Sequence, residues 1–174
     1  MIAKVIMLSL YVTFVAVGAL LQSSSFKECG KDIPTPYFFN LSNCAATQSV
    51  CPLYMGIPIN TIFTYTIPYE TQSMKVRAAF RFPTGLAMWM PYVGFLRNGC
   101  WNGWNNYQCP AQQGQVGSYS TGNITVPKIP GADNVRLDIK FMMKDDKERD
   151  IFCLIVNTII KKYPVASSKT NYVL

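Results

Sequence analysis

The sequence predicts an all-β protein in which two antiparallel sheets pack face to face. Proline and glycine recur every few residues from Pro52 to Gly131, and they leave no window for a three-turn amphipathic helix. Between them lie short runs in which apolar and polar residues alternate, as on strands with one buried face. The length of 174 residues fits one domain with about seven such strands.

The chain opens with a segment typical of exported proteins. Lys4 precedes an apolar run over residues 5–21, and small residues follow at 23–25. We predict that residues 1–25 form a signal peptide, cleaved between about residues 19 and 25. A transmembrane anchor is the alternative interpretation, because this apolar run has the minimum length that spans a bilayer.

Eight segments of the remaining chain have strand-like composition, rich in Val, Ile, Thr and aromatic residues or alternating in polarity. They are residues 37–41, 61–67, 74–82, 86–92, 116–120, 123–126, 135–144 and 151–160. We expect residues 26–162 to form the folded domain and residues 163–174 to be a disordered tail.

Two of these segments, 74–82 and 135–144, alternate most clearly. The side chains expected to face inward are Met74, Val76, Ala78, Phe80 and Phe82 in the first, and Val135, Leu137, Ile139, Phe141 and Met143 in the second. Charged residues 144–148 then interrupt the apolar pattern and predict a hairpin turn before the last strand.

All six cysteines follow the predicted signal peptide, and an even number in an exported chain of this size predicts three disulfides. Six cysteines allow fifteen pairings. Proximity in sequence favours Cys44 with Cys51 and Cys100 with Cys109, which would leave Cys29 for Cys153. Two glycosylation triplets, beginning at Asn40 and Asn123, agree with export.

The composition argues against several classes of function. The chain has no histidine and no CxxC pair, so we expect no metal site, no cofactor and no His-based catalysis. The net charge of +7 is scattered, with no basic run longer than Lys161-Lys162, which argues against nucleic acid. A basic surface suits anionic membranes or acidic ligands, although ordinary solubility explains it equally well.

The acidic residues give no sign of an active site. Glu28, Asp32, Asp133, Asp138, Asp145 and Asp146 cluster at predicted turns, and none interrupts an apolar strand face where burial would tune a pKa. We therefore expect no enzyme.

Several short motifs together resemble the Niemann-Pick type C2 family over residues 26–160. They are Phe26-Lys27-Glu28-Cys29-Gly30, Asn40-Leu41-Ser42 ahead of Cys44, Cys51-Pro52-Leu53 with Gly56, Asn98-Gly99-Cys100 followed by Cys109-Pro110, and Lys144-Asp145-Asp146-Lys147 leading to Phe152-Cys153. No single motif is specific, but six cysteines in this order with these neighbours form a strong joint signal.

The resemblance implies an ML-type lipid-recognition domain. Such a domain is an immunoglobulin-like sandwich of about seven to eight strands with an apolar cavity that holds a sterol or another lipid. It also implies disulfides Cys29–Cys153, Cys44–Cys51 and Cys100–Cys109. By the same resemblance we expect a secreted or endolysosomal monomer that delivers its ligand to a membrane or to a Niemann-Pick C1-like membrane protein.

The residues predicted to line the cavity are mostly phenylalanine and methionine, whose rings and flexible thioethers can repack around a guest. They are Phe63, Met74, Val76, Phe80, Phe82, Met88, Met90, Tyr92, Phe95, Phe141, Met143 and Phe152. An ordinary filled core is the alternative. Residues 86–95 are interpreted as a cavity rim or as a strand buried on both faces.

Some features depart from the family and leave the ligand open. Phe141 and Leu154 stand where the family commonly has tryptophans, and the Cys100–Cys109 loop is long and contains Trp101, Trp104 and Tyr107. This loop either contacts a membrane or partner, or folds back on the sandwich.

Three other functions are consistent with the same fold. One is an immune protein that recognises bacterial lipid or glycolipid. A basic rim near Arg77, Arg81 or Arg97 would favour this function, because it would bind the phosphate groups of such a ligand. The others are an extracellular carrier of small hydrophobic signalling molecules and a purely structural secreted module.

Overall fold

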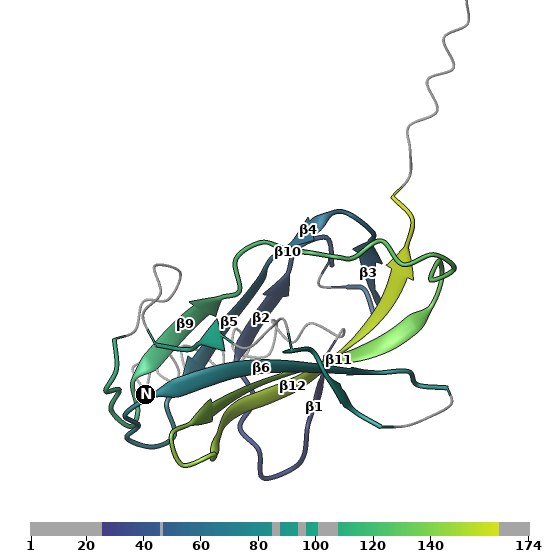
Figure 1. The fold of residues 1–174 in the computed structure, drawn as a ribbon. Helices are drawn as coiled ribbons and strands as arrows, with labels where there is room; N and C mark the ends of the chain where they lie inside the picture. The colour runs from purple at the N-terminus through teal and green to yellow at the C-terminus, as the bar shows by residue number, and fades with distance from the viewer. Residues whose placement is uncertain (1–25, 46, 85–87, 94–96, 101–107, 164–174) are drawn as a thin grey trace, which may run out of the picture.

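The computed structural model describes residues 26–45, 47–84, 88–93, 97–100 and 108–163. Their regular structure consists of β-strands arranged in two layers (Figure 1). The strands in chain order are β1 (Phe26–Glu28), β2 (Phe38–Leu41), β3 (Cys51–Tyr54), β4 (Pro58–Ile59), β5 (Thr61–Thr66), β6 (Met74–Arg81), β7 (Met90–Pro91), β8 (Arg97–Asn98), β9 (Val116–Ser120), β10 (Ile124–Thr125), β11 (Arg136–Asp145) and β12 (Asp150–Lys161).

The larger layer is built around the hairpin of β11 and β12, which pair antiparallel along residues 136–144 and 150–159. β6 pairs with the other edge of β11, and β7 and β8 pair with β6. The outer edge of β12 is shared: β1 pairs antiparallel with its middle, and β3 pairs parallel with its end, from Thr158 to Lys161.

The smaller layer contains β2, β5 and β9 in that order, all antiparallel. A separate ribbon of β4 and β10 continues from it, paired only through Ile124 with Ile59 and Thr125 with Pro58. In Figure 1 this ribbon lies at the end of the sandwich where the two layers stand apart.

Side chains alternate between the two faces of most strands, and the inward-facing side chains of both sheets pack together in one core. Val76, Ala78, Phe141 and Met143 are buried on the large sheet, and Phe39, Phe63, Tyr65 and Tyr119 are buried on the small one. The register of β6 and β11 places Val76 opposite Met143 and Ala78 opposite Phe141, so the inward-facing residues of the two strands lie side by side. The alternation predicted for 74–82 and 135–144 holds for most positions, but Ala79 and Asp138, predicted to face outward, are buried, and Phe82, predicted to face inward, is 39% exposed.

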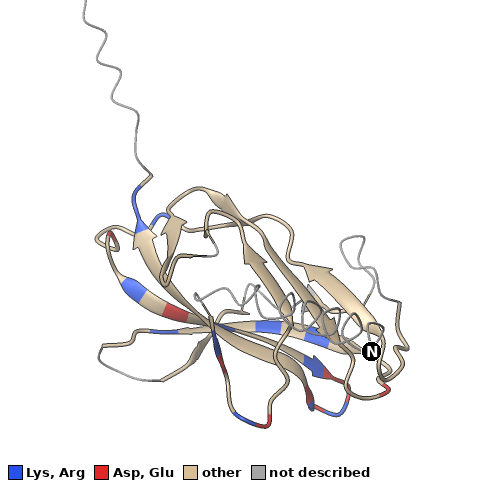
Figure 2. Cartoon of the chain, turned by 180° about the vertical axis from the view of Figure 1, so that it is seen from behind, with Lys and Arg blue, Asp and Glu red and all other residues tan. Residues whose placement is uncertain are grey.

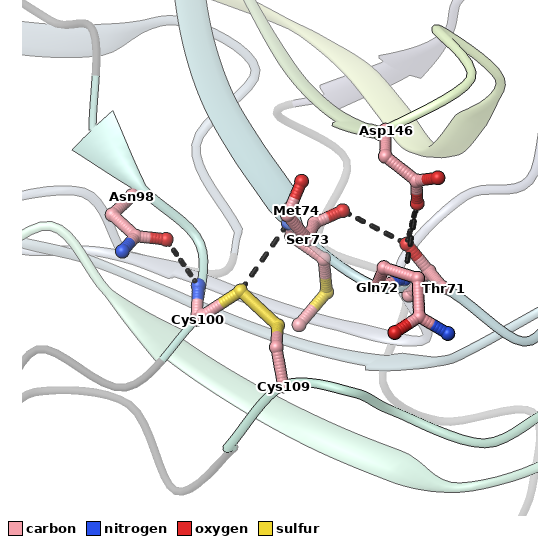
Figure 3. The surroundings of a disulfide bond; sticks show 8 residues. All are labelled: Thr71, Gln72, Ser73, Met74, Asn98, Cys100, Cys109 and Asp146. Atoms are coloured by element: carbon pink, nitrogen blue, oxygen red, sulfur yellow. Dashed lines mark hydrogen bonds between the residues drawn. A yellow bond between two sulfur atoms is a disulfide. The ribbon is translucent and has the colours of Figure 1, made fainter.

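Three disulfides join Cys29 with Cys153, Cys44 with Cys51, and Cys100 with Cys109. The first fastens the edge strand β1 to the central strand β12, and this is the pairing that the family resemblance implies. The third lies beside the start of β6, where the backbone N–H of Met74 donates to Cys100 Sγ at 3.3 Å (Figure 3).

The turn between β11 and β12 is fixed by two carboxylates. Asp145 Oδ1 accepts hydrogen bonds from the backbone N–H groups of Lys147 and Arg149, and its Oδ2 pairs with Arg149 Nε at 2.7 Å. Asp146 Oδ1 reaches across to the Thr71 hydroxyl and the Gln72 N–H, both at 3.0 Å (Figure 3). The charged hairpin turn predicted at 144–148 is confirmed, with β11 extending to Asp145.

The two sheets differ sharply in charge. The strands of the small sheet, with sequences FFNL, TIFTYT and VGSYS, contain no charged residue. The long strands of the large sheet carry many charged residues, and Figure 2 shows these blue and red segments gathered on that layer.

Candidate functional site

An apolar cavity of about 340 Å³ lies between the layers near the β4–β10 ribbon. At about 30 Å³ per water molecule this space exceeds a structural water site, and it falls in the lower part of the range for small-molecule sites. The lining residues are Leu53, Ile59, Ala78, Ala79, Phe80, Phe82, Tyr92, Ile124, Thr125, Val126, Pro127, Ile129, Leu137, Ile139, Phe141 and Ile160. Among these described residues, only Tyr92 and Thr125 have a polar group in the side chain.

The large sheet supplies one wall of the cavity. β6 and β11 place Ala78 opposite Phe141 and Phe80 opposite Ile139. Ala78 is the smallest of the inward-facing residues of β6, so the space that a larger side chain would fill is left open beside Phe141. The opposite wall comes from Ile59 on β4 and from Ile124 and Val126 on and after β10.

The floor of the cavity is an aromatic cluster that fills the other half of the sandwich. Phe63 lies at its centre, with ring centroids 5.3 Å from Phe141, 5.1 Å from Phe152 and 6.5 Å from Tyr119. Phe39 packs on Phe63 at 5.4 Å. Phe141 belongs both to this cluster and to the cavity lining, so it marks the boundary between filled core and open space.

The rim of the cavity is apolar and partly exposed. Phe82 and Tyr92 are about two-fifths exposed, at 39% and 40%, and Ile129 is 45% exposed. Large apolar side chains in water at the mouth of an apolar cavity are typical of a binding site.

The structure distributes the predicted cavity residues over three places. Phe80, Phe82, Tyr92 and Phe141 line the cavity. A second group packs instead in the filled part of the core and has essentially no exposed surface: Phe63, Met74, Val76, Met143 and Phe152. Met90 lies half-buried on β7, Met88 is 67% exposed outside the strands, and Phe95 lies outside the described residues.

Sequence reasoning missed most of the aliphatic lining. Leu137 and Ile139 were predicted to face inward in segment 135–144 but were not included among the predicted cavity residues. The alternating pattern of that segment could have identified both as cavity residues. Ile59, Val126 and Pro127 lie in or beside strands of two residues, too short to show any period. Residues 86–95 lie partly outside the described residues, and of the predicted strand 86–92 the structure describes pairing at Met90–Pro91.

The acidic residues do not converge on the cavity. Asp138 pairs with Arg81 on the opposite face of the large sheet, at 3.0 Å. The prediction that no acid interrupts a buried strand face is wrong, because Asp138 and Asp145 both lie on β11 and are buried. Arg149 and two backbone N–H groups satisfy the Asp145 carboxylate. Within the described residues, no group of three or more acidic or cysteine side chains is placed to hold a metal ion.

The arginines predicted to form a basic rim are not grouped at the mouth. The Arg77 guanidinium donates two hydrogen bonds to the Glu148 carboxylate near the β11–β12 turn, from Nη1 to Oε2 at 3.0 Å and from Nη2 to Oε1 at 2.9 Å. Arg81 stacks over Trp89 at 4.6 Å, and Lys140 lies 4.3 Å from the same ring. Burial of the Lys140 ammonium, and next the positive charge of Arg81, lower the pKa of Lys140 from 10.5. The side chain of Arg97 is not described.

Both glycosylation triplets present exposed asparagines, Asn40 on β2 and Asn123 just before β10. Among the residues that the structure describes, no helix is long and apolar enough to cross a membrane.

The protein is a disulfide-bonded β-sandwich with two layers of mostly antiparallel strands and an apolar cavity between them. The chain belongs to the ML-domain family, whose model matches residues 23–160. Among solved structures it is similar to a Niemann-Pick type C2 protein from Japanese carpenter ant, with a TM-score of 0.66, 18% identity, and coverage of 78% of this chain and 98% of that one.

A second solved structure, chicken MD-1 complexed with lipid IVa, matches with a TM-score of 0.45 and 12% identity, covering 76% of this chain and 85% of that one. No curated protein sequence matches.

Proposed function

We propose that the protein is a secreted carrier that holds a sterol or similar hydrophobic molecule in the cavity and delivers it to a membrane or membrane protein. The observation that carries this proposal is the 340 Å³ space lined by hydrocarbon at the open end of the sandwich. Residues 1–25 serve as the signal peptide, residues 26–162 as the carrier domain and residues 163–174 as a tail. Binding and release need no covalent step.

Burial of apolar surface supplies the affinity. A ligand that hides about 400 Å² gains about 10 kcal/mol at about 25 cal/mol per Å², before several kcal/mol of association cost are deducted. The rings of Phe80 and Phe141 in the cavity lining offer flat surfaces for a ring system. Exposed Phe82 and Tyr92 at the rim suit contact with a membrane surface during transfer.

The test is binding of a fluorescent sterol to the secreted protein and to a variant with a filled cavity. Ile139→Trp projects a larger ring into the space opposite Phe80 and is expected to weaken sterol binding about tenfold or more. Val116→Trp, at an exposed position on β9 outside the cavity lining, is the matched control and leaves binding unchanged. Thermal melting establishes that both variants are folded.

Mass spectrometry of co-purified lipid identifies the natural ligand. Competition by lipopolysaccharide but not by sterols would assign the cavity to bacterial lipid instead. Protein that is recovered empty and whose melting temperature responds to neither sterols nor fatty acids contradicts the proposal.

A further inference from the structure

A second concavity, of about 490 Å³, lies on the outer face of the large sheet, across the sheet from the apolar cavity. It is lined by Lys27, Ser49, Val50, Arg81, Phe82, Pro83, Arg136, Asp138, Asn157 and Thr158, and we call it the outer groove. Register aligns Arg81, Asp138 and Asn157 in one row across β6, β11 and β12. This row alternates with the inward-facing residues of the same strands, which places it outside the sandwich.

The outer groove is positively charged. Its lining contains three basic side chains and one carboxylate, and that carboxylate, Asp138, is already paired with Arg81. Within the part of the chain that the structure describes, neither Lys27 nor Arg136 forms an ion pair. Two positive charges therefore remain without a counter-charge at the surface of the groove.

The groove also has the directional groups that an oxyanion needs. The Asp138 contact and the stacking on Trp89 hold the Arg81 guanidinium in place, which reduces the cost of ordering it on binding. Ser49 contributes a hydroxyl and Asn157 an amide, while the Thr158 hydroxyl is occupied as donor to the carbonyl of Leu137 at 2.7 Å. Guanidinium, ammonium, hydroxyl and amide donors around one hollow suit a phosphate group.

We propose that the outer groove is a second binding site, which takes a phosphate-type oxyanion. Its position suggests a source for that anion. Phe82 lines both the outer groove and the apolar cavity, so the two spaces meet at the end of β6. A single-chain lipid phosphate would place its chain in the cavity and its head group in the groove, a step that rests on the proposed carrier function.

Inorganic phosphate, decyl phosphate and decanol distinguish the groove from the cavity. Phosphate is titrated into the labelled protein while amide NMR shifts are followed, and the two decyl compounds are compared by calorimetry. The test variant is Lys27→Gln/Arg136→Gln. The control is Lys75→Gln/Lys147→Gln, which removes the same charge from exposed positions about 20 Å away along the sheet.

We expect phosphate to shift amides around Arg81 and Asn157, and the test variant to weaken that binding about tenfold while the control does not. Shifts scattered over all basic residues, or equal loss in both variants, overturn the proposal. Decyl phosphate binding about tenfold or more tighter than decanol, with the advantage lost in the test variant, assigns the anion to a lipid head group.

The remaining outcomes separate the two proposals. If decanol and decyl phosphate bind equally while phosphate still occupies the groove, the groove binds a free anion, and the proposed carrier function is still supported. If phosphate binds the groove while decanol and sterols do not bind at all, the proposed anion site is supported and the proposed carrier function is contradicted.

Discussion

Ala78 and Phe141 lie opposite each other on neighbouring strands, and together they decide where the core ends and the cavity begins. Phe141 closes the aromatic cluster, while the single methyl group of Ala78 leaves its neighbourhood unfilled. Val76 and Met143, one pair further along, fill the same space completely. The change from filled core to open cavity therefore falls between these two neighbouring pairs of residues.

Asp146 links the β11–β12 turn to the segment before β6 and gives stability a specific pH dependence. The Gln72 N–H, and next the Thr71 hydroxyl, hold the pKa of Asp146 below its ordinary value of 3.8. A lowered folded-state pKa contributes stability above the ordinary value, and this contribution is lost as the pH falls through the folded-state pKa. We expect Asp146→Asn to be less stable than the wild type at pH 7 and equally stable near pH 2.

Urea unfolding at several pH values measures this difference. Asp32→Asn, at an exposed loop position, is the control and is expected to follow the wild-type profile. A constant gap between Asp146→Asn and the wild type across the whole range would show that ionisation of Asp146 plays no part.

For single residues, the sequence predicted which face of a strand a side chain lies on better than whether that side chain packs in the filled core or lines the cavity. Alternation in 74–82 and 135–144 separated most inward side chains from outward ones, because a strand fixes its side-chain direction locally, but it failed for Ala79 and Asp138, which are buried. It could not separate Met74 and Met143, which are in solid core, from Phe80 and Ile139, which line the cavity. That distinction depends on the distance to the opposite sheet, which no local pattern encodes.

At the scale of elements, β12 organises the large sheet. It pairs with β11 along one edge and with β1 and β3 along the other, and the Cys29–Cys153 disulfide fixes β1 to it. β1 is only three residues long and sits at an edge, so its few hydrogen bonds hold it weakly by themselves. The covalent bond compensates for that shortness.

The disulfides are expected to differ in their contribution to stability because they close loops of different length. Cys29–Cys153 spans 124 residues and Cys44–Cys51 spans 7. In the chain-entropy account, these loops correspond to about 5 and about 2.5 kcal/mol. Cys29→Ala/Cys153→Ala should therefore lower the free energy of unfolding by about 2 kcal/mol more than Cys44→Ala/Cys51→Ala, as measured by guanidinium denaturation. Equal losses would contradict the loop-length argument.

The long strands could be predicted from the sequence, and of the short ones β2 and β10 lie within predicted segments while several others were missed. Residues 61–67, 116–120 and 151–160 agree with β5, β9 and β12 to within one or two residues. β1, β3, β4 and β8 were missed, since runs of two to four residues show no periodicity; Pro52 in β3 and Pro58 in β4 weaken the strand signal further. The parallel pairing of β3 with β12 is a long-range contact that follows from the closure of the sandwich.

The whole molecule has a small sheet whose strands are neutral and a large sheet whose strands carry charged residues (Figure 2). The outer groove and the apolar cavity are both lined by residues of the large sheet. The two-sheet architecture was predictable because strand number, turn spacing and cysteine order agreed. The location of the cavity at the β4–β10 end was not, because it arises where a short ribbon replaces a full strand. The outer groove combines β1, β6, β11 and β12 with the segment before β3, and only the folded chain brings these together.

The β4–β10 ribbon also determines how easily the cavity can be reached. Two residue pairs hold it, with Gly56 N–H to Val126 carbonyl at 2.8 Å and Val126 N–H to Ile57 carbonyl at 3.3 Å beside them. Local opening there breaks few hydrogen bonds, whereas β11 and β12 separate only when the sheet unfolds. Amide protons of the ribbon should exchange with deuterated water much faster than those of the central hairpin, and an occupied cavity should slow them selectively. Entry and exit of a guest then need no unfolding of the sandwich.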